Sequence, residues 1–193
     1  MREETTGNNP TPLARRFLAK CKENGFQVAY TPSYNDLLSV LSEWSTGWGV
    51  GKIVLGGVSA GLAERLRGAL SVQSPCEVLG EADLEKLGDL RAGSLGVFRA
   101  RAGVAETGGL VIIDDWKANL ASLIPEYSVG LLKESEVLPD YWELSSLIRK
   151  SRPAGLAIIS GPSSTSDIEL THVVGVHGPV ACGCVVAGFE LDE

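Results

Sequence analysis

The chain has 193 residues, with 24 Asp and Glu against 17 Lys and Arg, so its formal net charge is −7. Hydrophobic residues make up 44% and charged residues 21%, a balance typical of a folded globular domain and unlike a disordered chain. The acidic excess argues against a nucleic-acid partner or an anionic membrane surface, because little basic surface is left to neutralise phosphates. No apolar run reaches the ~20 residues that cross a bilayer, so we expect no membrane span.

Residues 1–11 are polar and mixed in charge, so we expect a flexible leader before a single domain over residues 12–193. The first half of that domain alternates between helical and strand spacing of its apolar residues. Thr11-Pro12 opens a helical run, and Ser33 resembles the N-terminal cap of a second helix. We expect helices over about 12–24, 34–44, 59–70 and 82–90, and strands over 26–30, 52–55 and 76–79.

The second half consists mainly of short strands separated by glycines. We expect strands over 97–102, 103–107, 110–114, 129–132, 156–159, 173–176 and 181–189, and a helix from about Asp140 to Lys150. The run at 156–159 is fully apolar and is expected to be buried. Apolar strands that alternate with helices predict an α/β fold, with one open and mostly parallel sheet flanked by helices.

The cysteines indicate a reduced, cytoplasmic protein. No CxxC pair occurs among Cys21, Cys76, Cys182 and Cys184, and we expect all four to behave as small buried apolar residues. Cys182 and Cys184 are two residues apart in a strand, so they should point to the same face. With His177 they would supply at most three ligands, and we therefore predict neither a metal site nor a cofactor.

Three glycine-rich breaks are candidate ligand sites, because open α/β sheets bind ligands beyond the carboxyl ends of strands, where turns expose backbone N–H groups. The first is Gly56-Gly57, before the helix that starts at Ser59. It matches no complete nucleotide-binding pattern, and a tight turn before a capped helix is the simpler interpretation. The second contains Glu106, Thr107 and Gly108. Glu106 could be an acid, a base or a nucleophile, or simply a solvated turn residue.

The third break follows the strand at 156–159 and is rich in hydroxyl groups. Such a loop suits a phosphate or a carboxylate, because a helix could begin after it and helix N-termini favour anions. The alternative is a serine turn that caps a helix and binds nothing. His177 lies on a turn and could transfer a proton or contact an anion. The candidate residues here are Ser160, Gly161, Ser163, Ser164, Thr165, Asp167, Glu169, His177 and Gly178.

Four segments resemble, in the same order, the signature segments of the LUD-domain family: AETGGL (105–110), LASLIP (120–125), SGPSSTSDIE (160–169) and GVHGP (175–179). The best-known members are bacterial lactate-utilisation proteins, and the resemblance is greatest to their small C-type component. It implies a Rossmann-like fold similar to that of sugar-phosphate isomerases and CoA transferases (NagB/RpiA/CoA transferase-like). It also implies a role in L-lactate oxidation to pyruvate beside separate iron–sulfur proteins, and it adds Ser122 to the candidate ligand-binding residues.

Three positions depart from the family pattern. Gly109 stands where a hydroxyl residue is usual, Asn119 where arginine is usual, and Ser164 where a basic residue is usual. Two cations are thus missing from the expected anion site. Because charge-assisted hydrogen bonds are about twice as strong as neutral ones, a strongly anionic ligand should bind less well here.

Three functions are compatible with these residues. The first is a ligand-binding or accessory component of lactate utilisation, with iron–sulfur partner proteins and a small anionic or carboxylate ligand. The second is a stand-alone enzyme on a small carboxylate, sugar phosphate or CoA thioester, with Glu106 as nucleophile or base and His177 as proton shuttle. The third is a divergent, non-catalytic domain. Because each lies at a glycine-rich break beside an apolar strand, Glu106, Ser163, Thr165 and His177 should converge at one rim of the sheet.

Overall fold

The computed structural model describes residues 9–71, 75–78, 91–162, 164–166, 172–174 and 178–192. Its helices are α1 (Pro12–Glu23), α2 (Tyr34–Gly47), α3 (Ala60–Leu70), α4 (Trp116–Leu123) and α5 (Tyr141–Ser151), with the 3-10 turn η2 (Glu134–Glu136). Its first six strands are β1 (Phe26–Thr31), β2 (Lys52–Gly56), β3 (Cys76–Val78), β4 (Ser94–Arg99), β5 (Ala102–Val104) and β6 (Gly109–Ile113). The others are β7 (Tyr127–Lys133), β8 (Val137–Leu138), β9 (Leu156–Ile159), β10 (Ser164–Ser166), β11 (His172–Val174) and β12 (Ala181–Ala187).

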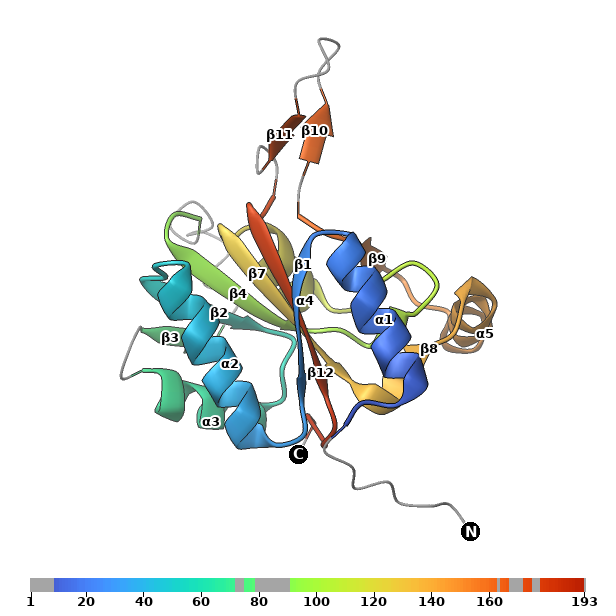
Figure 1. The fold of residues 1–193 in the computed structure, drawn as a ribbon, viewed down its shortest axis with the longest axis horizontal. Coiled ribbons are helices and arrows are strands. Elements are labelled where there is room, and N and C mark those ends of the chain that lie inside the picture. Colours follow the sequence, from blue (N-terminus) through green and yellow to red (C-terminus); the bar gives the residue numbers. More distant parts are fainter. Residues whose placement is uncertain are drawn as a thin grey trace.

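A main sheet forms the centre of the fold (Figure 1). In the described residues it has six strands in the order β1-β12-β7-β4-β2-β3, and every pairing is parallel. Its inner strands are buried on both faces, as their continuous apolar sequences predicted. The expected α/β fold with a mostly parallel sheet is confirmed.

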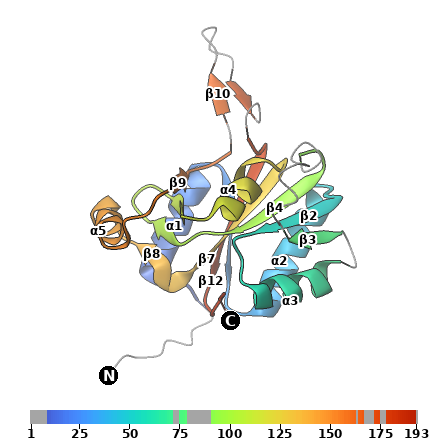
Figure 2. The same ribbon diagram turned by 180° about the vertical axis from the view of Figure 1, so that it is seen from behind.

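Helices cover both faces of the main sheet. α2 and α3 pack on one face, where Leu41 and Trp44 meet Leu66 and the strand residues Ile53 and Val97. α1 and α4 pack on the other face (Figure 2). α4 lies directly on two strands, because Gly56 and Gly96 have no side chains: a Cβ at either position would overlap the backbone of α4. Glycine at these two positions therefore lets the helix pack closely on the sheet.

A second sheet lies on the α1 side of the main sheet and was not predicted. Within the described ranges its order is β8-β5-β6-β9, with β6 antiparallel to both neighbours. α5 covers its outer face and buries Leu144 against β5 and β6. The prediction that 156–159 is a buried strand is wrong: β9 is an edge strand, and Leu156 and Ile158 are 42% and 37% exposed. An apolar run alone does not distinguish an edge strand from an inner one.

Side-chain caps start the helices. Thr11, Ser33 and Ser59 each accept a hydrogen bond from a backbone N–H in the first turn, as their positions in the sequence suggested. α4 was not predicted, although Asp115 caps it by accepting from the N–H of Ala118 at 2.9 Å. The helix expected over 82–90 lies outside the described residues. No helix in the described part of the chain is long and apolar enough to cross a membrane.

Two strands outside both sheets form a hairpin that projects from the body of the domain in both views (Figures 1 and 2). β10 pairs antiparallel with β11, so that Ser164 lies opposite Val174 and Ser166 opposite His172. Ser164–Ser166, expected as part of a loop, is therefore a strand. The hairpin connects β9 of the second sheet to β12 of the main sheet.

Candidate functional site

A pocket of about 260 Å³ brings together four of the residues predicted from the sequence: Ser122, Ser160, Gly161 and Gly178. They come from three signature segments and lie up to 56 positions apart in the chain. Its other lining residues are Leu123, Ile158, Ile159, Pro179 and Cys182. We call this hollow the amino-edge pocket, because Gly178 and Cys182 lie at the amino end of β12.

Local packing holds each wall of the amino-edge pocket in place. Ser122 is buried in the last turn of α4, where its hydroxyl donates to the carbonyl of Asn119 at 2.8 Å. Gly161 turns the chain after β9 with φ of +133°, a value that an L side chain rarely adopts, and it lies against the carbonyl of Asn24 at the end of α1. The glycine at this position is therefore required by conformation and by space.

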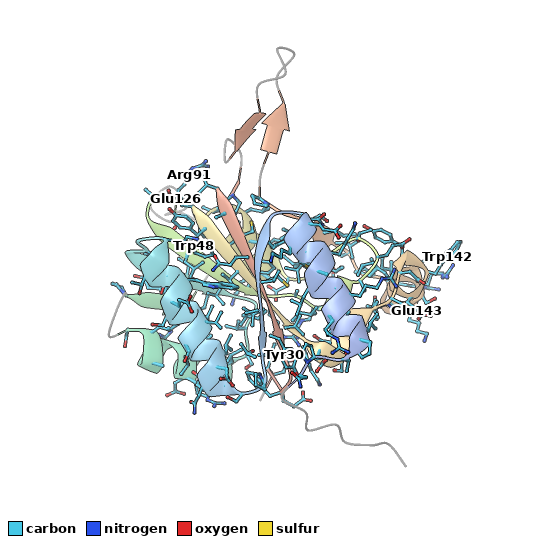
Figure 3. The ribbon with its side chains drawn as sticks, viewed as in Figure 1. Tyr30, Trp48, Arg91, Glu126, Trp142 and Glu143 are labelled. Carbon is cyan, nitrogen blue, oxygen red and sulfur yellow. The ribbon has the colours of Figure 1, made fainter. Side chains whose placement is uncertain are left out.

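The location of the pocket differs from expectation. The segment after β9 was expected at the carboxyl ends of the strands, together with Gly56-Gly57. Because β9 belongs to the second sheet, its carboxyl end meets the amino edge of the main sheet, on the side of the hairpin. In Figure 3 the labelled residues Arg91 and Glu126 mark the amino edge of the main sheet, and Tyr30 marks the carboxyl edge. The Gly56-Gly57 turn lies at the carboxyl edge, so the predicted breaks do not share one edge of the main sheet.

The Glu106 turn packs against the end of α1, close to the amino-edge pocket. Asn24 Nδ2 donates to the carbonyl of Thr107 at 2.7 Å, and Cys21 Sγ donates to the carbonyl of Gly108 at 3.4 Å. The Glu106 side chain is exposed. Thr107 Oγ1 is buried and has no hydrogen-bond partner in the described residues. Leaving such a group unpaired costs roughly 1–3 kcal/mol.

The structure explains one departure from the family pattern. A Cβ at Gly109 would lie 2.8 Å from Ile158 Cγ2, 3.3 Å from Ser160 Oγ and 3.5 Å from Thr107 Oγ1. A side chain at this position therefore requires Ile158 to move. The same contacts show that Thr107, Ser160 and position 109 are close neighbours at one side of the pocket.

Several predicted residues cannot be located. Ser163, Asp167, Glu169 and His177 lie outside the described residues, and for Ser164 and Thr165 only the β10 backbone is described. The convergence of Glu106, Ser163, Thr165 and His177 therefore stays a prediction. Cys182 and Cys184 point to the same face of β12, as their spacing predicted.

The described residues that line the amino-edge pocket present neutral polar and apolar groups. None of its described lining residues carries a charge at neutral pH, since burial raises the pKa of the Cys182 thiol to about 11, partly offset by the contact of Cys182 Sγ with Ser128 Oγ at 3.3 Å. A protonated, buried thiol is a poor nucleophile. The sequence did not mark Cys182 as a pocket residue.

A second hollow adjoins the amino-edge pocket at Gly178. It has a volume of about 340 Å³ and is also lined by Arg91, Ala92, Glu126 and Val180. Arg91 and Glu126 lie beside each other at the same edge as the hairpin (Figure 3). Arg91 was not singled out in the sequence, and it places a cation near the pocket although Asn119 and Ser164 are not basic.

Comparison with known proteins gives consistent matches. The family model of the LUD domain matches residues 14–186. An uncharacterised Escherichia coli protein, YkgG, is 41% identical over 103 residues, which cover 50% of this chain and 45% of that protein. Lactate utilization protein C 1 of Bacillus mycoides is 32% identical over 103 residues, covering 50% and 44%, and lactate utilization protein C of Deinococcus radiodurans is 36% identical over 92 residues, covering 44% and 42%. The matched segments thus span less than half the length of each relative.

A solved structure shows the same fold. The crystal structure of a DUF162 family protein from Deinococcus radiodurans superposes with a TM-score of 0.62 at 18% identity, covering 91% of this chain and 96% of that chain. At this identity the likeness concerns the fold alone.

Proposed function

We propose that this chain, which belongs to the LUD domain family, is a ligand-binding accessory component of lactate utilisation. In this role it acts in the cytoplasm, supports the oxidation of L-lactate to pyruvate, and works with separate iron–sulfur proteins. The observation that carries the proposal is the amino-edge pocket, where residues of three signature segments meet.

The ligand proposed for the amino-edge pocket is a small carboxylate. Serine hydroxyls, glycine backbone and apolar side chains line the pocket, an arrangement that suits a compact ligand with one polar end. Ser160 is exposed at the rim, so its hydroxyl can make a polar contact with a ligand there. Arg91 in the adjoining hollow supports a negative charge on the ligand.

Binding accounts for these residues better than catalysis does. A catalytic Glu106 would need to face a substrate in a partly desolvated site, and its side chain is exposed on a turn. Cys182 is protonated at neutral pH, and among the described residues that line the pocket there is no cation to activate its thiol. We therefore assign the oxidation itself to the partner proteins.

The proposal is tested in bacteria that lack their own C-type protein and require it to grow on L-lactate. Ser160 is exposed at the rim of the pocket, so Ser160→Trp should fill the pocket while the chain still folds. We expect the wild type and Ser160→Ala to restore growth, and Ser160→Trp to fail. Ser39→Trp on the exposed side of α2 is the matched control and should restore growth.

Partner binding is measured in the same strains by affinity purification and iron analysis of the eluate. We expect iron–sulfur proteins to co-purify with the wild type. Growth on L-lactate with folded Ser160→Trp would contradict the role of the pocket. Absence of iron in every eluate would contradict the proposed partners.

A further inference from the structure

A second pocket lies at the carboxyl edge of the main sheet, at the other end of the strands from the amino-edge pocket. Its volume is about 540 Å³. Its walls come from the turn after β2, the segment after β4, the start of α4 and the segment after β12. We call it the carboxyl-edge pocket, and its residues used below are Gly57, Ser59, Arg101, Asp115, Lys117 and Asp192.

The chain topology makes this position a natural ligand site. From β2 the chain passes through α3 to β3 on one side, and from β4 it passes through β5, β6 and α4 to β7 on the other. α3 and α4 pack on opposite faces of the main sheet, and both begin beside the pocket. Ligands of open parallel sheets bind where connections diverge in this way, beyond the carboxyl ends of the strands.

Gly57 brings the two helix starts together. It has φ of +69°, and a Cβ there would lie 2.5 Å from Asp115 Oδ2 and 2.7 Å from Ala118 Cβ. Ser59 caps α3 on the other side of the turn. The Gly56-Gly57 break is therefore more than a tight turn, because Gly57 also lines the carboxyl-edge pocket.

Two cationic side chains line the carboxyl-edge pocket. Lys117 is half-buried over the ring of Trp116, with its ammonium 5.6 Å from the ring centroid, and it forms no salt bridge with any described carboxylate. Arg101 is 41% exposed, and its salt bridge to Asp192 is long, at 3.4 Å. Lys117 can therefore turn toward an anion, and Arg101 can do so by exchanging its long contact with Asp192 for one with the anion.

The guanidinium of Arg99 lies behind the pocket and is fully buried at the end of β4. Glu136 accepts from its two terminal nitrogens at 2.7 and 2.8 Å, which by itself completes an ion pair. Asp192 adds a second carboxylate, with Oδ2 2.9 Å from Nη2 and Oδ1 3.2 Å from Nε. This two-point geometry is how an arginine binds the planar carboxylate of a ligand.

Asp192 can leave this position without unfolding its segment. Its side chain is 42% exposed, whereas Leu191 is 1% exposed and its carbonyl accepts from the Ser59 hydroxyl at 3.4 Å. The backbone is thus anchored beside α3. Rotation of the Asp192 side chain alone would expose one side of the Arg99 guanidinium to the pocket.

We infer that the carboxyl-edge pocket is a second binding site, for a small organic carboxylate, and that the side chain of Asp192 occupies the place of the ligand carboxylate on Arg99 and Arg101. The two carboxylates compete for the same donors, because they share charge and shape. The inference goes beyond the proposed function and uses none of the residues of the amino-edge pocket.

The test is calorimetric titration of the full chain with pyruvate, L-lactate or inorganic phosphate at low ionic strength. Asp192→Asn keeps the size of the side chain and removes its charge. We expect it to bind pyruvate or L-lactate at least about tenfold more tightly than the wild type. Glu190→Gln is the matched control, because Glu190 lies in the same segment but pairs with Lys133, and it should bind as the wild type does.

Three outcomes would overturn the inference. The first is equal affinity, or no binding, in the wild type and Asp192→Asn. The second is tighter binding of phosphate without tighter binding of either carboxylate, which would exclude the ligand class. The third is tight binding that persists when Arg101→Gln and Lys117→Gln are added to Asp192→Asn, which would place the ligand elsewhere, such as the amino-edge pocket.

A second variant covers the case in which Asp192→Asn fails to fold. Arg101→Gln with Lys117→Gln in the wild-type background leaves the Arg99 ion pairs intact. This double variant should bind pyruvate or L-lactate about fivefold more weakly than the wild type. Unchanged affinity would overturn the inference independently of Asp192.

Discussion

The two carboxylates on Arg99 should compensate for each other in stabilising the fold. Glu136 and Asp192 each receive two hydrogen bonds from one guanidinium that is fully buried. A hydrogen bond to a charged group contributes about 1.5–3 kcal/mol, and partial exposure of both carboxylates reduces this through solvent screening. We therefore expect Glu136→Gln and Asp192→Asn each to lower the free energy of unfolding by roughly 1–2 kcal/mol.

The double variant distinguishes a shared partner from two separate ones. With either carboxylate left, the buried charge of Arg99 is still paired, but with both removed it has no counter-charge, a situation that costs about 3–5 kcal/mol. The loss in the double variant should thus exceed the sum of the single losses by about 1 kcal/mol. Urea unfolding at pH 7 measures this, with an unchanged m value as the sign that the unfolded state is the same. Additivity within roughly 0.5 kcal/mol would refute the reasoning.

The pH dependence supplies a separate check. The hydrogen bonds from Arg99 hold the pKa of Asp192 below its ordinary value, in spite of partial burial. A carboxyl group whose pKa is lowered by folding stabilises the native state above the pKa of the unfolded chain, about 3.9, and loses that contribution as the pH falls through the lowered value. The stability difference between the wild type and Asp192→Asn should therefore shrink below about pH 4. A difference that stays constant down to pH 2 would contradict the shift.

Three further predictions concern the amino-edge pocket and its surroundings. Gly109→Ser should lower the free energy of unfolding by about 1–2 kcal/mol, because the new side chain contacts Ile158, and adding Ile158→Ala should relieve much of that loss. Thermal unfolding of the two single variants and the double variant tests this. An unchanged stability of Gly109→Ser would show that Ile158 moves freely. Glu106→Gln should change the free energy of unfolding by less than about 0.5 kcal/mol, because the side chain is exposed, and should alter ligand binding or partner binding. Titration and co-purification measure the two kinds of binding. A variant identical to the wild type in ligand and partner binding would leave Glu106 without a role. Ser164→Arg should strengthen phosphate binding by roughly 1.5–3 kcal/mol in calorimetry at low salt, and equal affinities would mean that position 164 does not face the site.

Local signals in the sequence predicted the strands of the main sheet and the helices α1, α2 and α3, but not α4. Thr11, Ser33 and Ser59 cap their helices because a hydroxyl at the N-cap accepts from a nearby backbone N–H, which depends only on neighbouring residues. β2 and β7 were recognised from continuous apolar runs, because both faces of a parallel sheet are covered. These features need no information from distant parts of the chain.

Features that depend on distant residues were missed or placed wrongly. β8 has two residues, too few to show a period, and it pairs with β5, which lies far from it in the sequence. Asp192 lies 93 positions from Arg99, so nothing near either residue marks the contact. The signature segments contain four of the residues that line the amino-edge pocket, Ser122, Ser160, Gly161 and Gly178, but they do not indicate the edge of the main sheet on which the pocket lies.

β12 connects the two pockets along a single strand. Cys182 near its start lines the amino-edge pocket, and Asp192, five residues beyond its end, lines the carboxyl-edge pocket. Seven residues of strand separate the two ends by roughly 23 Å. β12 is hydrogen-bonded to β1 and β7 on both sides and packed on both faces, so it has one arrangement and no alternative to switch to. We therefore expect this strand to carry little communication between the two pockets, so that a ligand bound in one should leave the affinity of the other nearly unchanged.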